Sequence, residues 1–256
     1  MTTTPDFIVA IPARFASTRL PGKPLALING EPMVAHVAHR ALAAGAREVV
    51  VATDDDRIVQ ALRNLPVLAV LTRSDHASGS DRLAECAEQL GWADDAIIVN
   101  LQGDEPQAPA SGIRAVAATL AQSDAPMATL ATPISGVEEL LSPHCVKVVV
   151  GSNGNALYFS RAPLPWPRDA FAKSCEALPD DVPFLRHIGI YAYRAAFLRR
   201  FARLAPTPLE RAESLEQLRA LEHGFTIAVR LTPEPFPAGI DTAEDLQRVA
   251  LELSEQ

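Results

Sequence analysis

Short apolar runs rich in β-branched residues alternate with longer segments of helical period over the first half of the chain. Residues 32–44 place Val34, Val37 and Ala41 on one helical face, and Gly45 follows as a stop signal. The apolar runs are short and bounded by turn residues, which is typical of buried strands. This alternation predicts βαβ units and a mostly parallel sheet. We expect strands at residues 7–11, 48–52, 67–71, 97–101 and 127–132, and helices at 32–44, 57–64, 80–90 and 110–122.

The pattern changes after about residue 133. Two apolar runs at 146–150 and 156–160 flank the turn sequence GSNG, which indicates a hairpin, and residues 163–183 contain five prolines, which disfavour a regular helix or a central strand. Alternation then resumes. We expect strands at 188–193 and 226–231, and helices at 195–203, at 209–223 and from about residue 242. The chain is therefore predicted to be one α/β domain, residues 1–256, with residues 133–187 as an embedded, smaller β-rich arm.

Composition and charge exclude several classes of protein. The 256 residues are 48% hydrophobic and carry a net charge of −8, so a large core is possible, but the broad positive field that nucleic acid or an anionic membrane requires is missing. The three cysteines, Cys86, Cys145 and Cys175, have neither disulfide nor zinc-site spacing. No segment reaches the roughly 18 apolar residues of a membrane span, and no basic leader opens the chain. We expect a cytoplasmic protein.

The stretch IPARFASTRLPGKPL, residues 11–25, concentrates positive charge in a loop after the first predicted strand. Arg14, Arg19 and Lys23 lie among turn residues, and no acidic residue occurs between Asp6 and Glu31. The Walker A and GxGxxG patterns do not match here. Two guanidinium groups and one ammonium group suit a polyphosphate, and the opening loop leaves the strand at the sheet edge where ligands bind. The alternative is three solvated surface charges.

Two acidic residues are candidate Mg²⁺ ligands. Asp104 in VNLQGDEP follows a predicted strand, although glycine, acid and proline are also a common turn sequence. Asp241 in GIDTAEDLQRV precedes the terminal helix, where a helix cap is the rival interpretation. The capping box could be formed by Asp241 with Glu244 or by Thr242 with Asp245.

Eight segments together resemble one family, the bacterial 3-deoxy-manno-octulosonate (Kdo) cytidylyltransferases. They are IPARFASTRLPGKPL, TRSDHASGSDRLAE, VNLQGDEP, VKVV, ALYFSRAPLPW, FLRHIGIYAYR, PLERAESLEQLRALEHG and GIDTAEDLQRV, in that order along nearly the whole chain. The opening segment is shared more widely among nucleotidyltransferases, whereas RHIGIYAYR is more specific. The resemblance implies a Rossmann-like nucleotidyltransferase fold, a homodimer, and transfer of CMP from CTP to Kdo for lipopolysaccharide synthesis.

The resemblance also implies roles for particular residues. Arg14 and Lys23, with Arg19 in the same loop, match positions around the CTP triphosphate, and Asp104 and Asp241 match the family's magnesium ligands. The positions that match the cytosine pocket are Ala13, Arg73, Ser78 and Gly79, whereas His76 is interpreted as structural. The positions that match the Kdo site are Gln102, Arg161, His187, Tyr191 and Glu213.

Several alternatives stay open at this point. Arg161 or His187 is the natural partner for the sugar carboxylate. His187 could equally be a buried, hydrogen-bonded histidine, and Tyr191 could be a core residue. At the level of function, the rivals are another sugar nucleotidyltransferase, such as one for sialic acid or a hexose 1-phosphate, and a catalytically silent nucleotide-binding module. The presence of both Asp104 and Asp241 argues against the silent module.

Overall fold

A nine-stranded sheet forms the centre of the molecule in the computed structural model, which describes residues 5–17 and 20–254. The strand order is β11-β7-β10-β6-β1-β4-β5, and the hairpin β8–β9 is attached to β10. A separate two-stranded sheet pairs β2 with β3. The strands are β1 (Ile8–Ala13), β2 (Leu27–Ile28), β3 (Glu31–Pro32), β4 (Glu48–Thr53), β5 (Leu68–Leu71), β6 (Ile97–Asn100), β7 (Met127–Pro133), β8 (Lys147–Val150), β9 (Ala156–Ser160), β10 (Leu185–Arg194) and β11 (Ile227–Leu231).

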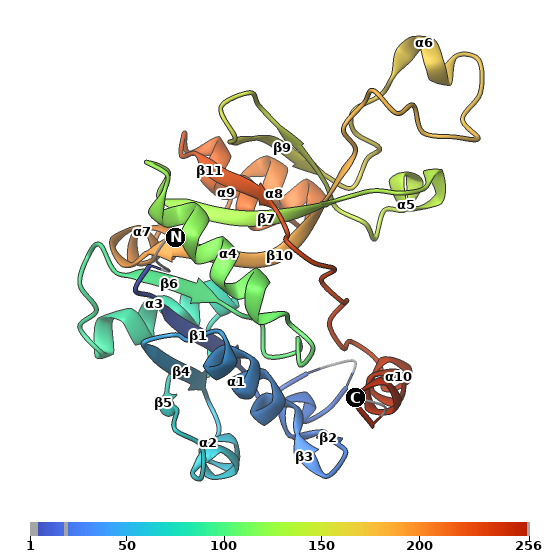
Figure 1. Cartoon of the computed structure of the whole chain (residues 1–256). Helices are drawn as coiled ribbons and strands as arrows, with labels where there is room; N and C mark the ends of the chain where they lie inside the picture. The colour runs from blue at the N-terminus through green and yellow to red at the C-terminus, as the bar shows by residue number, and fades with distance from the viewer. Residues whose placement is uncertain (1–4, 18–19, 255–256) are drawn as a thin grey trace.

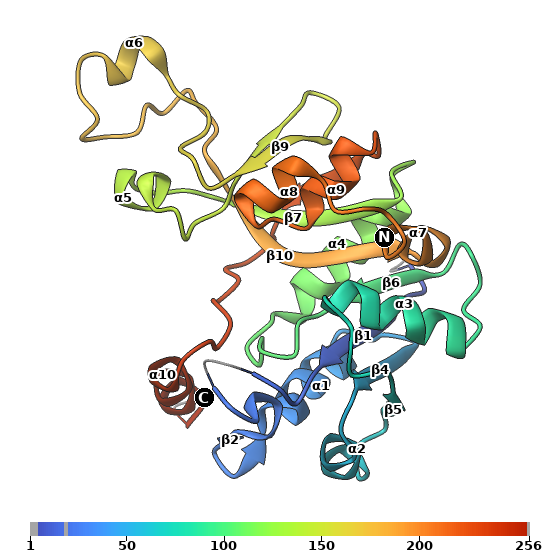
Figure 2. The same ribbon diagram turned by 180° about the vertical axis from the view of Figure 1, so that it is seen from behind.

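Helices cover both faces of this sheet (Figures 1 and 2). Residues of α1, α2 and α4 pack on one face, and residues of α3, α7 and α9 pack on the other. The last helix, α10, lies apart from the sheet beside β2, at the end of an extended segment that follows β11 (Figure 1). The helices are α1 (Met33–Ala43), α2 (Asp56–Leu62), α3 (Gly79–Gln89), α4 (Ala110–Ala121), α5 (Val137–Leu141), α6 (Arg168–Phe171), α7 (Ala195–Phe201), α8 (Pro208–Glu213), α9 (Gln217–Glu222) and α10 (Ala243–Ser254), with a 3-10 turn η1 (Lys23–Leu25).

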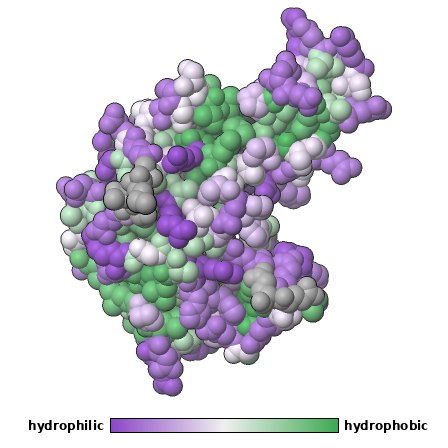
Figure 3. Space-filling model, viewed as in Figure 1, coloured by the Kyte–Doolittle hydropathy of each residue, from purple (hydrophilic) through white to green (hydrophobic). Residues whose placement is uncertain are grey.

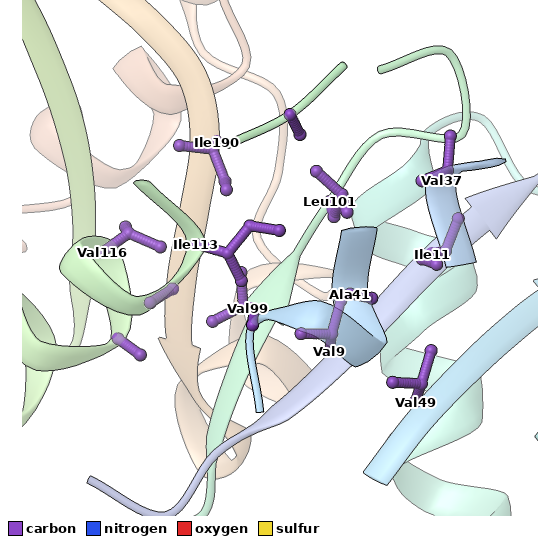
Figure 4. Packing of buried hydrophobic residues seen from close by; sticks show 14 of the residues in the cluster. Val9, Ile11, Val37, Ala41, Val49, Val99, Leu101, Ile113, Val116 and Ile190 are labelled. Carbon is purple, nitrogen blue, oxygen red and sulfur yellow. The ribbon is translucent and has the colours of Figure 1, made fainter. Parts of the chain in front are cut away.

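The larger core cluster joins the middle of the sheet to α1 and α4. Figure 4 shows Val9 of β1, Val99 of β6 and Ile190 of β10 together with Ala41 of α1 and Ile113 of α4. All five are fully buried. Because strands buried on both faces need apolar residues at every position, this packing explains the continuous apolar runs in the sequence.

Strand direction places the loops that can bind a ligand. Strand β1 pairs in parallel with both β4 and β6, and β4 pairs in parallel with β5. The connection through α1 covers one face of the sheet and the one through α3 covers the other, so the chain changes face between β1 and β6. In parallel sheets, ligands bind beyond the carboxyl ends of the strands at such a point. The loops after β1 and β6 therefore line the expected crevice.

The predicted fold class is confirmed, and several elements differ from expectation. The short strands β2 and β3 and the helix α5 were not predicted. The helix predicted at 209–223 is two helices, α8 and α9, because Ser214 adopts a left-handed conformation with φ 52°. Strand β10 begins at Leu185, three residues before the predicted strand, and runs antiparallel to β6 and β7 with a register shift between Ile188 and Tyr191. The proline-rich segment contains a short helix, α6.

The segment predicted as an arm projects from the sheet and has its own small core. Ile134, Leu140, Phe171 and Phe184 are buried together there, apart from the two large clusters. Figure 3 shows this projection as largely hydrophilic at its tip, with the surface hollowed between it and the part around α10. Within residues 5–17 and 20–254, no helix combines the length and apolar character needed to span a membrane.

A buried lysine holds the base of this arm. Lys147 on β8 is fully buried, and its Nζ donates hydrogen bonds to three carbonyl oxygens, those of Ser142 (2.8 Å), Cys145 (2.6 Å) and Arg161 (2.6 Å). Burial lowers the pKa of Lys147 below its usual value. The three bonds join the segment that enters β8 to the residue that follows β9.

Replacing this ammonium group tests its structural role. Lys147→Met keeps the length of the side chain but leaves the carbonyl groups of the buried Cys145 and of the half-buried Ser142 and Arg161 without their donor, so we expect the free energy of unfolding to fall by roughly 2–4 kcal/mol. Lys173→Met, at an exposed position of the arm, is the matched control and should change it by less than about 0.5 kcal/mol. Denaturant titration of the two variants measures both values, and equal values would contradict the assignment.

Candidate active site

A cleft of about 320 Å³ opens at the carboxyl edge of β1 and β6, a size suited to a small-molecule ligand. The opening loop forms one wall, the loop before α3 forms the second, and the residues after β6 form the floor. Its lining residues are Pro12, Ala13, Arg14, Ala16, Ser17, Lys23, Pro24, His76, Ala77, Ser78, Gly79, Arg82, Gln102, Gly103, Asp104 and Asp241.

Three charged groups meet on one side of this cleft. The Nζ of Lys23 lies 2.6 Å from Oδ2 of Asp104 and 3.1 Å from Oδ1 of Asp241. The side chain of Lys23 is 13% exposed, whereas those of Asp104 and Asp241 are 33% and 45% exposed, so water weakens the attraction from the carboxylate side. Two carboxylates thus share a single cationic atom. The predicted phosphate-binding and metal-binding residues are in direct contact.

Close backbone packing brings Asp241 to Asp104. The backbone N–H of Ile240 donates to the carbonyl of Asp104 (2.8 Å), and a Cβ on Gly239 would lie only 3.1 Å from that same oxygen. On the other side, a Cβ on Gly103 would lie 2.8 Å from the carbonyl oxygen of Pro12. Glycine at 103 and 239 therefore permits the three segments to approach one another.

The structure also shows which residue caps α10. Asp245 accepts hydrogen bonds from the backbone N–H groups of Asp241 and Thr242, and its own N–H donates to Oγ1 of Thr242. The capping box is thus Thr242 with Asp245, the second of the two arrangements considered from the sequence. The carboxylate of Asp241 points instead to Lys23.

The ring of Phe15 packs against another part of the opening loop. Gly22 has φ 68°, and a Cβ there would lie 3.3 Å from the ring of Phe15. The guanidinium carbon of Arg57 lies 3.6 Å from the centre of that ring. Ala13 ends β1 as a buried residue, and the exposed Arg14 lines the cleft. Arg19, the third positive charge of the sequence motif, lies outside the described residues.

The residues predicted for the base divide into two groups. Ser78 and Gly79 line the cleft, where Ser78 caps α3 in a capping box with Asp81 and Gly79 packs against Pro12. The side chain of Arg73 is exposed and paired with Asp75, away from the lining residues.

Two polar residues of this wall were not predicted for the nucleotide site. His76, interpreted as structural, lines the cleft and is hydrogen-bonded to Glu85. Arg82 also lines the cleft, and its side chain is 3% exposed. The sequence gives no signal that Arg82 lines a cleft, because the helical spacing of apolar residues does not show whether an arginine of the same helix faces a ligand site or solvent.

The residues predicted for the sugar lie in three places. Gln102 is in the cleft, and its Nε2 donates to Oδ1 of Asn100 (3.3 Å). His187 and Tyr191, both on β10, have ring centres 5.3 Å apart. Burial lowers the pKa of His187 to about 3, so its imidazole is neutral at pH 7. Its Nε2 lies 3.0 Å from Oγ1 of Thr129.

Arg161 and Glu213 form the third group. The carboxylate of Glu213 accepts hydrogen bonds from Oγ of Ser160 (2.5 Å) and from the backbone N–H of Arg161 (2.9 Å). The guanidinium of Arg161 donates to the carbonyls of Glu213 (2.8 Å) and Pro143 (2.9 Å). Glu213 is the last residue of α8, so this contact lies at the break between α8 and α9.

A second cleft, of about 510 Å³, lies next to the first. Glu105 and Gly239 line it, one residue after Asp104 and two before Asp241, and His187 lines its other side. Burial, together with the neighbouring Asp104 carboxylate, raises the pKa of Glu105 to about 8. Oε2 of Glu105 has no hydrogen-bond partner among the described residues. The two clefts therefore meet at the pair of candidate metal ligands.

The donor set fits a magnesium ion shared with a substrate. Asp104 and Asp241 converge on one cationic atom, and carboxylate oxygens are the ligands that Mg²⁺ prefers. Over residues 5–17 and 20–254, no group of three or more His, Cys, Asp or Glu residues is placed to hold a metal. Two carboxylates with substrate oxygens and water are the usual Mg²⁺ site of phosphate-transferring proteins.

Comparison with known proteins identifies the family. The family model for cytidylyltransferases matches residues 8–228. A 3-deoxy-manno-octulosonate cytidylyltransferase of Xanthomonas axonopodis pv. citri is 61% identical over 254 residues, which cover 99% of this chain and 98% of the relative. One from Stenotrophomonas maltophilia is 61% identical over 244 residues, 95% of each chain.

The structural comparison agrees with these relatives. A CMP:2-keto-3-deoxy-manno-octonic acid synthetase solved in complex with CTP superposes with a TM-score of 0.88 at 41% identity, covering 98% of this chain and 99% of that one. Sequence and fold thus match over almost the whole length, and the chain belongs to the 3-deoxy-manno-octulosonate cytidylyltransferase family.

Proposed function

We propose that this protein transfers CMP from CTP to Kdo, with release of pyrophosphate, and that the reaction requires Mg²⁺. The observation that carries the proposal is the contact of Lys23 with both Asp104 and Asp241 inside the cleft. A cytidylyltransferase needs cations for the triphosphate and carboxylates for a metal in one place, and this contact joins the two. The relatives are named for the same reaction, and the solved synthetase was bound to CTP.

The residues of the first cleft suit the nucleotide. Arg14 and Lys23 carry the positive charges that can neutralise the triphosphate, where negative charge builds on the leaving pyrophosphate during in-line attack at the α-phosphorus. Asp104 and Asp241 would hold Mg²⁺, which when bound supplies a positive charge that orients phosphate oxygens and lowers the pKa of a bound hydroxyl. Ser78 and Gly79 lie on the wall assigned to the base.

The second cleft suits the acidic sugar. Asp104 lines the first cleft and the next residue, Glu105, lines the second. A sugar hydroxyl at this border would lie beside the α-phosphate of a CTP molecule bound as we propose. His187 lines this cleft and would give the proposed sugar a polar neighbour, whereas Arg161, the residue after β9, is not part of its lining. Homodimerisation through the arm, a cytoplasmic location and a role in lipopolysaccharide synthesis stay predictions.

A pyrophosphate-release assay tests the proposed reaction. The four nucleoside triphosphates are each combined with Kdo, 8-amino-Kdo and sialic acid, with and without Mg²⁺. Pyrophosphate is expected only with CTP, Mg²⁺ and Kdo or its 8-amino analogue. Release with sialic acid alone would favour the rival nucleotidyltransferase, and CTP binding without any release would favour a nucleotide-binding module.

The Lys23 contact predicts opposite effects on two ligands. Lys23→Met removes the ammonium that occupies the carboxylate pair, so we expect Mn²⁺, a probe for the Mg²⁺ site, to bind about tenfold more tightly in the absence of nucleotide. The same change removes a phosphate contact, so CTP binding should weaken by about tenfold or more. Electron paramagnetic resonance and calorimetry measure the two affinities, with Lys173→Met as the control. Unchanged Mn²⁺ affinity would contradict the arrangement.

The Asp241 carboxylate can be tested apart from the helix cap. Asp241→Asn leaves Thr242 and Asp245 in place, so the melting temperature should stay near that of the parent, whereas turnover should fall about 100-fold or more and recover partly at high Mg²⁺. Thr242→Ala instead removes the cap and should cost about 1 kcal/mol of stability. Full turnover of Asp241→Asn at limiting Mg²⁺ would exclude the carboxylate from metal binding.

The half-buried His187 predicts a loss of stability in acid. Its pKa is lowered from 6.5 to about 3 in the folded state, so the unfolded chain binds the proton more readily and folding becomes less favourable as the pH falls below 6.5. Between pH 7 and pH 5 this contributes up to about 2 kcal/mol. His187→Gln should therefore flatten the dependence of unfolding free energy on pH. A pH profile of His187→Gln that matches that of the parent would refute the assignment.

A further inference from the structure

A single buried ion pair joins the loops that follow β1, β4 and β5. Arg82 lies on α3, and Asp54 is the residue after β4. Nη2 of Arg82 is 3.0 Å from Oδ2 of Asp54, and the two side chains are only 3% and 11% exposed. Arg82 lines the nucleotide cleft, whereas Asp54 lies behind the opening loop. Arg82 falls within the segment TRSDHASGSDRLAE, but neither Arg82 nor Asp54 is among the residues assigned above to the triphosphate, the base or the metal.

The arginine holds the wall that carries the candidate base pocket. One terminal nitrogen of Arg82 donates to Oγ1 of Thr72 (2.5 Å) and to the carbonyl of Arg73 (3.2 Å), and the other donates to Asp54. Thr72 is itself bonded to the carbonyl of Thr53 through its backbone N–H (2.8 Å) and its hydroxyl (3.0 Å). The segment that leads to Ser78 is thereby fixed against the end of β4.

The aspartate holds the opposite wall. The second oxygen of Asp54 accepts the backbone N–H of Phe15 (3.0 Å), and the ring of Phe15 packs under Gly22, the residue before Lys23. A continuous set of contacts therefore runs from Arg82 through Asp54 and Phe15 to the loop that carries Lys23. Both walls of the nucleotide cleft are tied to one ion pair.

We propose that Asp54 and Arg82 are positioning residues that set the separation of the two walls, and so determine the affinity for CTP without contributing to the chemical step. A buried ion pair is poorly explained by stability alone, because replacing both partners by apolar residues is often neutral or stabilising. Such a replacement would remove the hydrogen bonds that fix the positions of the two walls. The guanidinium of Arg82 donates to three acceptors in fixed directions, and the carboxylate of Asp54 accepts from two donors. The inference rests on the proposed function, since it takes CTP to be the occupant of the cleft.

The test separates positioning from folding with a double variant. Arg82→Met alone leaves Asp54 buried without its partner and is expected to lower stability, so it is compared with Asp54→Leu/Arg82→Met, in which both charges are absent. We expect the double variant to recover most of the melting temperature but to bind CTP at least about tenfold more weakly than the parent. Asp54→Asn, which retains hydrogen-bonding atoms, should show an intermediate loss.

Calorimetric titration with CTP and steady-state assays provide the readouts. The Michaelis constant for CTP should rise, while that for Kdo and the maximal rate at saturating CTP stay within about threefold of the parent. Arg203→Met is the control. Arg203 pairs with Glu88, which lies on α3 as Arg82 does, but this pair is exposed, with side chains that are 74% and 50% accessible. Its CTP affinity should match the parent.

The outcomes distinguish this inference from the proposed function. If the parent binds CTP and the folded double variant binds it within threefold, the pair is only structural and the inference is overturned. The inference is also overturned if the Michaelis constant for Kdo or the maximal rate changes as much as the Michaelis constant for CTP. If the double variant fails to fold, parent-like CTP affinity of Asp54→Asn overturns it. If the parent itself does not bind CTP, the proposed function fails.

Discussion

The attraction between one ammonium group and two carboxylates organises the candidate active site. Lys23, Asp104 and Asp241 come from three distant parts of the chain, and Lys23 and Asp241 are 218 positions apart in sequence. Two carboxylates close together repel unless a cation lies between them, and Lys23 supplies that cation. A substrate that brings its own divalent cation can take over this role, which leaves the lysine to bind phosphate. The same three residues thus neutralise one another in the protein alone and would bind phosphate and a divalent cation in the complex that we propose.

The sheet makes this contact possible because it gathers loops from distant positions at one edge. Parallel pairing of β1 with β4 and β6 sets the loops after these strands side by side. Asp241 reaches them differently, through an extended segment after β11 that hydrogen-bonds to the backbone of Asp104. The ion pair of Asp54 and Arg82 then fixes the remaining wall. Pairing of the strands brings the loops of the candidate active site together, and buried polar contacts then fix their positions relative to one another.

Much of the fold could be predicted from the sequence, because apolar runs and helical period report burial directly. The elements that were missed depend on tertiary contacts. The break at Ser214 leaves Glu213 bonded to Ser160 and Arg161 of another segment, which helical period cannot reveal. The cap of α10 was open between two pairs, and only the structure shows that Thr242 and Asp245 form it. The position of Arg82 in the cleft follows from its buried partner, Asp54, which no motif indicated.

Protonation states help to choose between the two candidate partners for the sugar carboxylate. His187 is neutral at pH 7, since burial lowers its pKa to about 3, so it would have to gain a proton in order to form an ion pair. Arg161 is permanently charged and donates to two backbone carbonyls, those of Glu213 and Pro143. Exchanging a neutral acceptor for a carboxylate strengthens a guanidinium hydrogen bond. For the Kdo site that we propose, this comparison favours Arg161 as the partner of the carboxylate and leaves the neutral His187 for a sugar hydroxyl, although only His187 lines the second cleft.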